Sequence, residues 1–373
     1  MTKQTSVLAA VLSMVFVGAL SQAALAQKQP SEKDEEKRQK EVREAMQREA
    51  RPMLTVINEW QKAQGNGEAQ AFVVNPREND AAKAVTPAAP ALDAKSVSFR
   101  YDLMKATDGR VYVPYTLSLP ADAVGNGPVS LYLRVVEKGA LPPADPKAVT
   151  PLPFEDFFSV EPKTAAGQPT RIMRAFSAVP GDYDLYLAVR AKMADPKKNQ
   201  NDPVKVVVVK QTASLANYWN GELTTSTVVV TPQIEMVQGN VSADEQRQRP
   251  YLFGQTEFVP SPDNKFKKTD ELNVVFQVYN PGLEAGQPKV TIEYSFHQKL
   301  PEGEKYFNKT SPQEMNGQTL PPGLDVASMQ MLPGGQAVPL GSFPAGDYRM
   351  EIKITDAVNK KTITRDVLFS VAG

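Results

Sequence analysis

The clearest pattern along the chain is the alternation of apolar and polar residues in short stretches. Residues 111–117 read VYVPYTL and residues 272–278 read LNVVFQV, with an apolar side chain at every second position of each. A period of two is typical of a strand with one buried face, and a slip of one residue would turn every side chain over. The stretches lie 161 residues apart (272 − 111), which predicts one strand used twice.

The next predicted strand repeats at the same separation. Residues 129–135 read VSLYLRV and residues 290–296 read VTIEYSF, again in phase. We therefore predict an internal repeat. The residues predicted to face its two cores are Val111, Val113, Tyr115, Leu117, Val129, Leu131, Leu133 and Val135 in the first copy and Leu272, Val274, Phe276, Val278, Val290, Ile292, Tyr294 and Phe296 in the second.

A shared turn marks a third element of each copy. The sequence PGDY ends at Tyr183, and PAGDY ends at Tyr348, 165 residues later (348 − 183). Gly181 and Gly346 permit the turn, and each tyrosine hydroxyl can donate to an upstream backbone carbonyl, as in the tyrosine corner of immunoglobulin-like sandwiches. Both turns are therefore predicted to have a structural role.

Alternation in the strands after these turns predicts one buried face and one face in water. The residues predicted to be buried are Tyr183, Leu185, Leu187 and Val189 in the first copy and Tyr348, Met350, Ile352 and Ile354 in the second. The residues predicted to face water are Asp184 and Arg190 in the first copy and Arg349, Glu351 and Lys353 in the second.

Each copy offers about seven short strands between Pro and Gly turns, which is typical of an Ig-like or fibronectin-like sandwich. We predict a mainly β fold of two tandem antiparallel β-sandwiches, residues 95–231 and residues 250–373, preceded by a short α-helical N-terminal segment. Residues 232–249 are polar and predict a hinge between the sandwiches.

Residues 27–64 predict a charged helical segment. From Ser31 to Arg51 there are seven acidic and seven basic side chains, several of them paired four residues apart. After Pro52, apolar residues recur at helical spacing, which predicts a second helix that docks on the following domain. The residues of that apolar face are Met53, Val56, Ile57 and Trp60. Residues 65–94, rich in Pro and Ala, predict a linker.

Residues 1–26 have the pattern of a cleaved signal peptide. A lysine precedes an apolar run from Val7 to Leu20, and Ala24-Leu25-Ala26 supplies the small-x-small pattern before the cleaved bond, so the mature chain is predicted to begin at Gln27. The run is shorter than the roughly 20 residues that span a bilayer, which favours cleavage over a membrane anchor. No later segment is long and apolar enough to cross, so we expect no transmembrane span after cleavage. The predicted location is extracytoplasmic, either periplasmic or secreted.

Composition narrows the compartment and the partners. The chain has 373 residues, and its 42 Lys and Arg balance its 42 Asp and Glu, so nothing in the total charge favours nucleic acid as a partner. It has no cysteine, which excludes disulfides and thiolate chemistry and favours a bacterial compartment for a secreted chain. The 31 prolines exceed the 22 glycines, which suits a loop-rich β architecture.

The C-terminal portion, from Tyr251 to Gly373, carries the sequences FGQTEFVP, VVFQVYNPG and FPAGDYRMEIKITD. In these it resembles the C-terminal β-sandwich tails of bacterial secreted proteins, some of which carry the domain named GWxTD. The naming motif is absent, because neither Trp60 nor Trp219 follows a glycine. The resemblance implies the fold and secretion, and it assigns no functional residue.

Motifs for catalysis are missing from the sequence. His297 is the only histidine, and alternation places it on the polar face of its strand, opposite Phe296. No nucleophile elbow, Walker motif or dinucleotide-binding glycine pattern occurs. We therefore predict no catalytic, metal-binding or cofactor-binding residues and no enzyme activity. A hydrolase with an unmarked pair of carboxylates stays an alternative.

Two aromatic pairs, Phe157 with Phe158 and Tyr218 with Trp219, are the candidate contacts for a ligand or partner. Aromatic side chains provide large contact areas, although packing inside the fold is the commoner explanation for them. The leading hypothesis is a non-catalytic interaction or structural protein with a protein or cell-envelope partner. The alternative is a carbohydrate-binding protein that uses the exposed aromatic residues.

Overall fold

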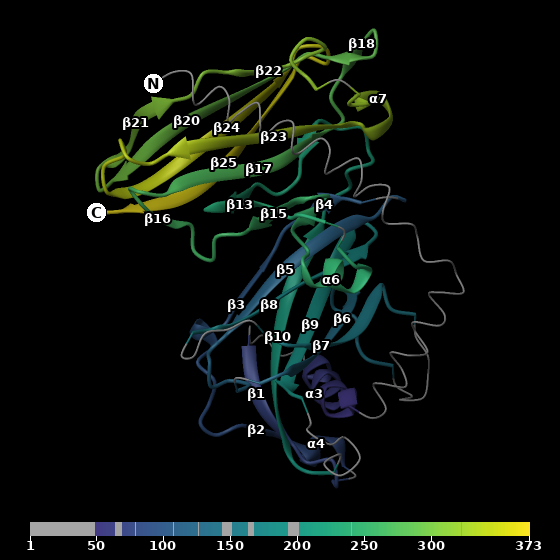
Figure 1. The fold of residues 1–373 in the computed structure, drawn as a ribbon. Helices are drawn as coiled ribbons and strands as arrows, with labels where there is room; N and C mark the ends of the chain where they lie inside the picture. The colour runs from purple at the N-terminus through teal and green to yellow at the C-terminus, as the bar shows by residue number, and fades with distance from the viewer. Residues whose placement is uncertain are drawn as a thin grey trace. The chain divides into compact units, whose positions relative to one another are not determined.

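The computed structural model describes residues 49–63, 69–78, 80–106, 108–125, 127–143, 151–162, 168–192, 201–239, 241–321 and 323–373. The predicted signal peptide and most of the charged helical segment lie outside these residues. The described chain is mainly β and divides into two compact units (Figure 1). The N-terminal unit comprises described residues of Lys28–Tyr101 and Arg110–Asn217, and the C-terminal unit those of Asp102–Gly109 and Tyr218–Gly373.

The N-terminal unit is built from two antiparallel sheets. The larger sheet has the strand order β2-β1-β10-β9-β6-β7, and in the smaller sheet β5 pairs with β3 and β8. Phe154 on β7 contacts Phe176 on β8, so side chains from the two sheets meet in a sandwich core. The elements are α3 (Arg51–Lys62), β1 (Ala69–Val74), α4 (Ala81–Ala84), β2 (Val85–Pro87), a 3₁₀ turn (Ala94–Ser96), β3 (Ser98–Tyr101), β5 (Val111–Leu119), β6 (Val129–Glu137), β7 (Phe154–Val160), β8 (Thr170–Ala178), β9 (Gly181–Ala191) and β10 (Val204–Leu215).

The C-terminal unit has a corresponding pair of sheets. The larger has the order β16-β25-β24-β20-β21, with β22 also on β20, and in the smaller β17 pairs with β11, β12 and β23. Two further small sheets are β13-β15-β14 and β18-β19. The elements are β4 (Met104–Lys105), β11 (Thr224–Thr225), β12 (Val229–Thr231), β13 (Gln233–Met236), α6 (Ala243–Gln248), β14 (Leu252–Phe253), β15 (Thr256–Val259), β16 (Lys265–Lys267), β17 (Glu271–Tyr279), β18 (Leu283–Glu284), β19 (Gln287–Pro288), β20 (Val290–Leu300), β21 (Gly303–Lys309), β22 (Gln313–Met315), α7 (Val326–Met329), β23 (Met331–Pro339), β24 (Gly346–Asp356) and β25 (Lys361–Ala372).

The predicted core faces are confirmed. Every residue that alternation assigned to a buried face, in both copies and after both turns, is buried. In the C-terminal unit these residues join one apolar cluster, because β17 and β23 supply it from one sheet and β20, β24 and β25 from the other. The mainly β, sandwich-like fold follows from burial of these two facing sets of apolar side chains.

Both tyrosine corners are present. The Tyr183 hydroxyl donates to the Val179 carbonyl at 3.0 Å, and the Tyr348 hydroxyl donates to the Pro344 carbonyl at 2.8 Å. The Tyr183 side chain folds back over Gly181, so closely that a Cβ at Gly181 would lie 3.2 Å from the tyrosine hydroxyl. The glycine therefore leaves the room that the tyrosine side chain needs.

Helix α3 buries the face that its spacing predicts. Met53, Val56, Ile57 and Trp60 are buried in a second apolar cluster, on the outer face of the larger N-terminal sheet. The residues that the sheet contributes to this cluster include Tyr132, Tyr186, Ala188, Val206 and Val208. The helix forms because its apolar stripe has a sheet to cover, and Arg51 and Lys62 at its two ends are exposed.

One prediction for the outer face of the larger N-terminal sheet is wrong. Asp184 and Arg190 do not face water, since they are only 3% and 1% exposed. Asp184 accepts hydrogen bonds from the Gly139 N–H at 3.1 Å and from Thr212 Oγ1 at 3.0 Å, and it pairs with Lys210 at 3.4 Å.

The corresponding prediction for the larger C-terminal sheet, that Arg349, Glu351 and Lys353 face water, is closer to the structure. Lys353 is exposed there, and Arg349 and Glu351 are half-buried and form an ion pair at 3.0 Å. Asp184 is enclosed by Gly139, after β6, and by side chains of β10, and alternation within a strand carries no signal of such neighbours.

The predicted linker at residues 65–94 is also wrong over much of its length. Ala69–Val74 forms β1, which pairs antiparallel with β10 along its whole length, and Val85–Pro87 forms β2, which pairs with β1. Ala71 and Val74 are buried. The Pro-rich and Ala-rich composition concealed a short apolar run, AFVV, that has enough β-branched character to extend the sheet.

The predicted hinge at residues 232–249 is part of the C-terminal unit. Within it, Gln233–Met236 forms β13 and pairs with β15, and Ala243–Gln248 forms α6. Strands β11 and β12 lie within the residues predicted for the first sandwich, but they pair with β17 of the C-terminal unit. The unit boundary therefore falls at Asn217 rather than at residue 231.

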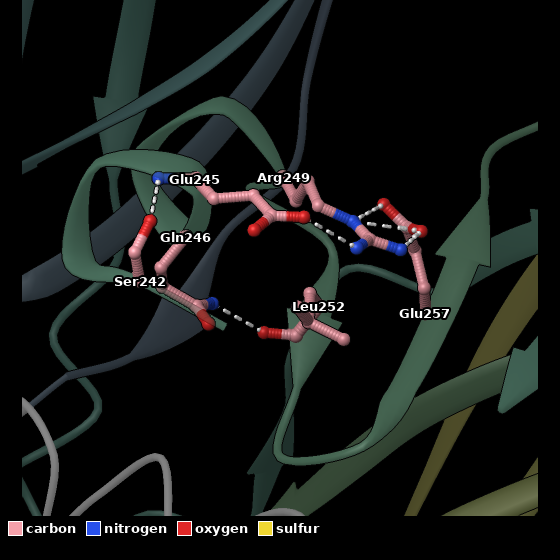
Figure 2. A network of polar contacts seen from close by, with 6 residues as sticks. All are labelled: Ser242, Glu245, Gln246, Arg249, Leu252 and Glu257. Atoms are coloured by element: carbon pink, nitrogen blue, oxygen red, sulfur yellow. Dashed lines mark hydrogen bonds and ion pairs between the residues drawn. The ribbon is translucent and has the colours of Figure 1, made fainter. Parts of the chain in front are cut away.

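Figure 2 shows the polar contacts that order this predicted hinge. Ser242 caps α6 by accepting from the Glu245 N–H at 3.2 Å, and the Gln246 side chain donates to the Leu252 carbonyl at 2.8 Å. Arg249 donates to both carboxylate oxygens of Glu257 and also pairs with Glu245. The hydrogen bond with Glu257 raises the pKa of Arg249. A polar sequence is thus held by its own side chains instead of by an apolar core.

Candidate functional site

The four aromatic candidates from the sequence do not form one site. Phe157 and Phe158 lie on β7 in the N-terminal unit, whereas Tyr218 and Trp219 lie in the C-terminal unit. Phe157 packs against the cluster under α3, and the Arg174 guanidinium lies 4.9 Å from the Phe158 ring centroid. The β7 pair is half-buried and contributes to packing.

Tyr218 and Trp219 occupy different environments although they are adjacent. Tyr218 is buried, and its ring centroid lies 4.7 Å from that of Tyr279. Burial raises the pKa of Tyr218. Trp219 is 45% exposed, and the Lys105 ammonium lies 4.2 Å from its ring centroid. Trp219 and Lys105 are therefore the accessible members of this group, which we call the Trp219 site: Lys105, Tyr218, Trp219 and Tyr279.

Backbone contacts from several segments fix the Trp219 site. The Lys105 N–H donates to the Tyr279 hydroxyl at 2.8 Å, so β4 is held beside the end of β17. The Asn280 amide donates to the carbonyls of Tyr218 at 3.1 Å and Glu222 at 2.9 Å, which holds the turn that carries Trp219. Asn280 has a φ of 56°, a conformation that Asn tolerates better than most residues.

The Lys105 ammonium in the Trp219 site has no carboxylate partner among the described residues, since none lies within ion-pair distance of it. Glu222, three residues after Trp219, pairs instead with Lys361 at 2.9 Å. Burial lowers the pKa of Lys105 because it disfavours the charged ammonium. Contact with aromatic faces offsets part of that penalty.

A second group lies on the outer face of the larger C-terminal sheet. Strand register places His297 opposite Tyr306 on one side and opposite Arg349 on the other, and Arg349 opposite Leu368. We call this line of four residues the Arg349 row. Tyr306 and Leu368 are 54% and 53% exposed, so two large apolar surfaces flank the two nitrogen-rich side chains.

Arg349 is fixed in place by three carboxylates. It contacts Glu304 at 2.9 Å, Glu351 at 3.0 Å and Asp366 at 2.7 Å. These contacts raise its pKa, chiefly through the hydrogen bond with Asp366, so the guanidinium stays charged.

The Arg349 row was not predicted from the sequence. Alternation placed His297 on the polar face of its strand, as observed, but gave no indication of the residues beside it. The members of the row come from four strands, and their register cannot be read from local alternation.

The described residues hold no cluster of three or more His, Cys, Asp or Glu side chains arranged for a metal ion. His297 contacts Ser295 at 3.4 Å and lies edge-on to Tyr306, with ring centroids 5.8 Å apart. Within the same part of the chain, none of the helices combines the length and apolar character that crossing a membrane requires.

Comparisons with protein-family models and with curated proteins assign the chain to no family. No protein-family model matches the chain, and no curated protein matches it. The resemblance to the tails of GWxTD-domain proteins stays a prediction from the sequence. The Trp219 site and the Arg349 row are therefore the features of the molecule that bear on its function.

Proposed function

We propose that the protein is a non-catalytic, extracytoplasmic interaction protein built from a duplicated β-sandwich. The observation that supports this most directly is the Arg349 row, where exposed Tyr306 and Leu368 flank a guanidinium already held in one geometry. Tyrosine and arginine are enriched in protein interfaces, and a pre-ordered arginine loses little conformational freedom on binding. The partner in this proposal is another protein.

The contrast between the two larger sheets supports the same proposal. The outer face in the N-terminal unit presents Tyr132, Ala188 and Val208 in one line across β6, β9 and β10, and α3 packs on them. The corresponding line across β20, β24 and β25 is Glu293, Lys353 and Thr364. A polar sheet face suits reversible contact with a partner better than permanent cover by an apolar helix.

Site-specific photocrosslinking in the native host tests the proposed surface. A photoreactive residue at Tyr306 should give one discrete crosslinked product, and the Arg349→Ala variant should lose it. Met236, on β13 and 56% exposed, is the matched control position and should not give this product. Equal products from Tyr306 and Met236, or none from Tyr306, would overturn the proposal.

The extracytoplasmic part of the proposal rests on the leader sequence and on the absence of cysteine. N-terminal sequencing of the protein isolated from its host should begin at Gln27. Retention of Met1 in a protein recovered from the cytoplasm would contradict this part alone and would leave the proposed surface untouched.

A further inference from the structure

We propose that Trp219 and Lys105 bind an acidic carbohydrate, with the carboxylate of the sugar against the Lys105 ammonium and its ring against the exposed part of the indole. This binding is independent of the Arg349 row, because it uses other residues and another class of ligand.

Trp219 is both accessible and held in place. The indole is 45% exposed, although Tyr218 beside it is buried. The turn that carries it is tied to Asn280 by hydrogen bonds of 3.1 and 2.9 Å. A large aromatic surface that is ordered before binding loses little freedom when a sugar ring covers it. Trp219 is therefore a ready contact surface for a sugar.

Lys105 supplies the preference for an acid. Its ammonium lies 4.2 Å from the Trp219 ring centroid and 5.9 Å from the Tyr279 ring centroid, and no described carboxylate pairs with it. A partly buried cation is poorly solvated, so a carboxylate that reaches it gains more than one that meets a fully hydrated lysine. A neutral sugar lacks that group, so the site favours acidic over neutral sugars.

Lys361 provides an internal contrast to Lys105. It is an exposed lysine of the same unit, but Glu222 already neutralises it at 2.9 Å. The lysine without a described acid is the one that touches the indole. The cation and the stacking surface therefore lie at the same point.

Titration of the full-length mature protein with trigalacturonate, and with cellotriose as the neutral sugar, tests the proposal. The chain has only two tryptophans, and Trp60 is buried, so a change in fluorescence reports mainly on Trp219. We expect saturable binding of trigalacturonate, at least about tenfold weaker binding of cellotriose, and weakening by salt. Calorimetric titration, which does not depend on the indole signal, should show weaker binding by Trp219→Ala.

Variants at the two lysines decide the role of the charge. Lys105→Met should weaken trigalacturonate binding at least about tenfold, Lys105→Arg should retain most of it, and Lys361→Met should leave it unchanged. Circular dichroism of each variant checks folding. Absent binding, equal binding of both sugars, or equal binding by folded wild type and Lys105→Met would overturn the proposal and leave a structural cation–π pair.

Discussion

The tyrosine corners are built by the same contact in both units. A tyrosine hydroxyl donates to the carbonyl four residues upstream, at 3.0 Å in one unit and at 2.8 Å in the other. Each hydrogen bond holds the beginning of a central strand, β9 or β24. At the scale of single residues the two units are therefore most alike.

Removal of one corner hydroxyl should lower stability by a modest amount. We expect Tyr348→Phe to reduce the free energy of unfolding by about 1 kcal/mol, because the Pro344 carbonyl loses its donor while the ring stays packed. Urea unfolding of the full chain measures this. Tyr306→Phe, at an exposed tyrosine of the same unit, is the control and should change little. An equal effect of both substitutions would refute this account.

Gly334 is required for a different reason, which is close packing. A Cβ at this position would lie 2.5 Å from the Phe276 ring, and Phe276 is part of the core. Gly334→Ala should therefore cost about 1–3 kcal/mol through overpacking.

Gly341 provides the matched control for Gly334. A Cβ there would come no closer than 3.9 Å to its nearest neighbour, the Lys268 carbonyl oxygen. Urea unfolding should thus separate Gly334→Ala from a nearly neutral Gly341→Ala. Equal free energies of unfolding for the two variants would show that close packing against Phe276 is not the reason for a glycine at position 334.

Whole elements distinguish the two units more than single residues do. The larger N-terminal sheet has an apolar cluster on its outer face, where α3 packs, beside buried polar residues such as Asp184 and Arg190, and it gains β1 and β2 at its edge. The larger C-terminal sheet has a polar outer face with ion pairs such as that of Lys353 with Glu293 at 3.0 Å. Corresponding strands thus support a packed helix in one unit and an accessible surface in the other.

Truncation of the α3 stripe should destabilise the N-terminal unit strongly. We expect Ile57→Ala to cost about 2–5 kcal/mol, because the side chain is fully buried between helix and sheet. Lys62→Ala, at an exposed position on the same helix, is the control. Thermal unfolding compares the two variants, and a small effect of Ile57→Ala would mean that the helix is dispensable to the unit.

At the scale of the molecule, buried tyrosines link stability to pH. Burial raises the pKa of Tyr115, Tyr132, Tyr279 and Tyr294 above the ordinary value of 10.0. The folded chain therefore keeps protons that the unfolded chain releases above about pH 10. Their contribution to stability is complete below that pH and declines as pH rises further.

We accordingly expect alkaline unfolding that begins above about pH 10. Circular dichroism and tyrosinate absorbance are followed together from about pH 9 to 12, and the part of the absorbance due to the buried tyrosines should appear only as the native circular dichroism is lost. Tyrosinate absorbance that rises to completion while the circular dichroism stays native would show that these hydroxyls are accessible in the fold, and would contradict the burial argument.

Local patterns in the sequence predicted the local features of the fold. Every residue that alternation assigned to a core face is buried, and helical spacing predicted the apolar residues that α3 buries. The prediction that Asp184 and Arg190 face water was wrong because their burial depends on neighbours from distant parts of the chain. The Trp219 site was half predicted, since Trp219 was named but Lys105, which precedes it by more than a hundred residues, gave no local signal.

The segment Asp102–Gly109 has a consequence for the order in which the molecule is made. It precedes most of the N-terminal unit in sequence, yet it belongs to the C-terminal unit. There the Leu103 N–H donates to Thr227 Oγ1 at 2.9 Å, and Asp102 accepts from the Tyr251 hydroxyl at 2.6 Å. These two partners follow it by 124 and 149 residues, so a ribosome that makes the chain from its N-terminus releases them much later. All strands of the N-terminal unit are synthesised before this segment can form either hydrogen bond.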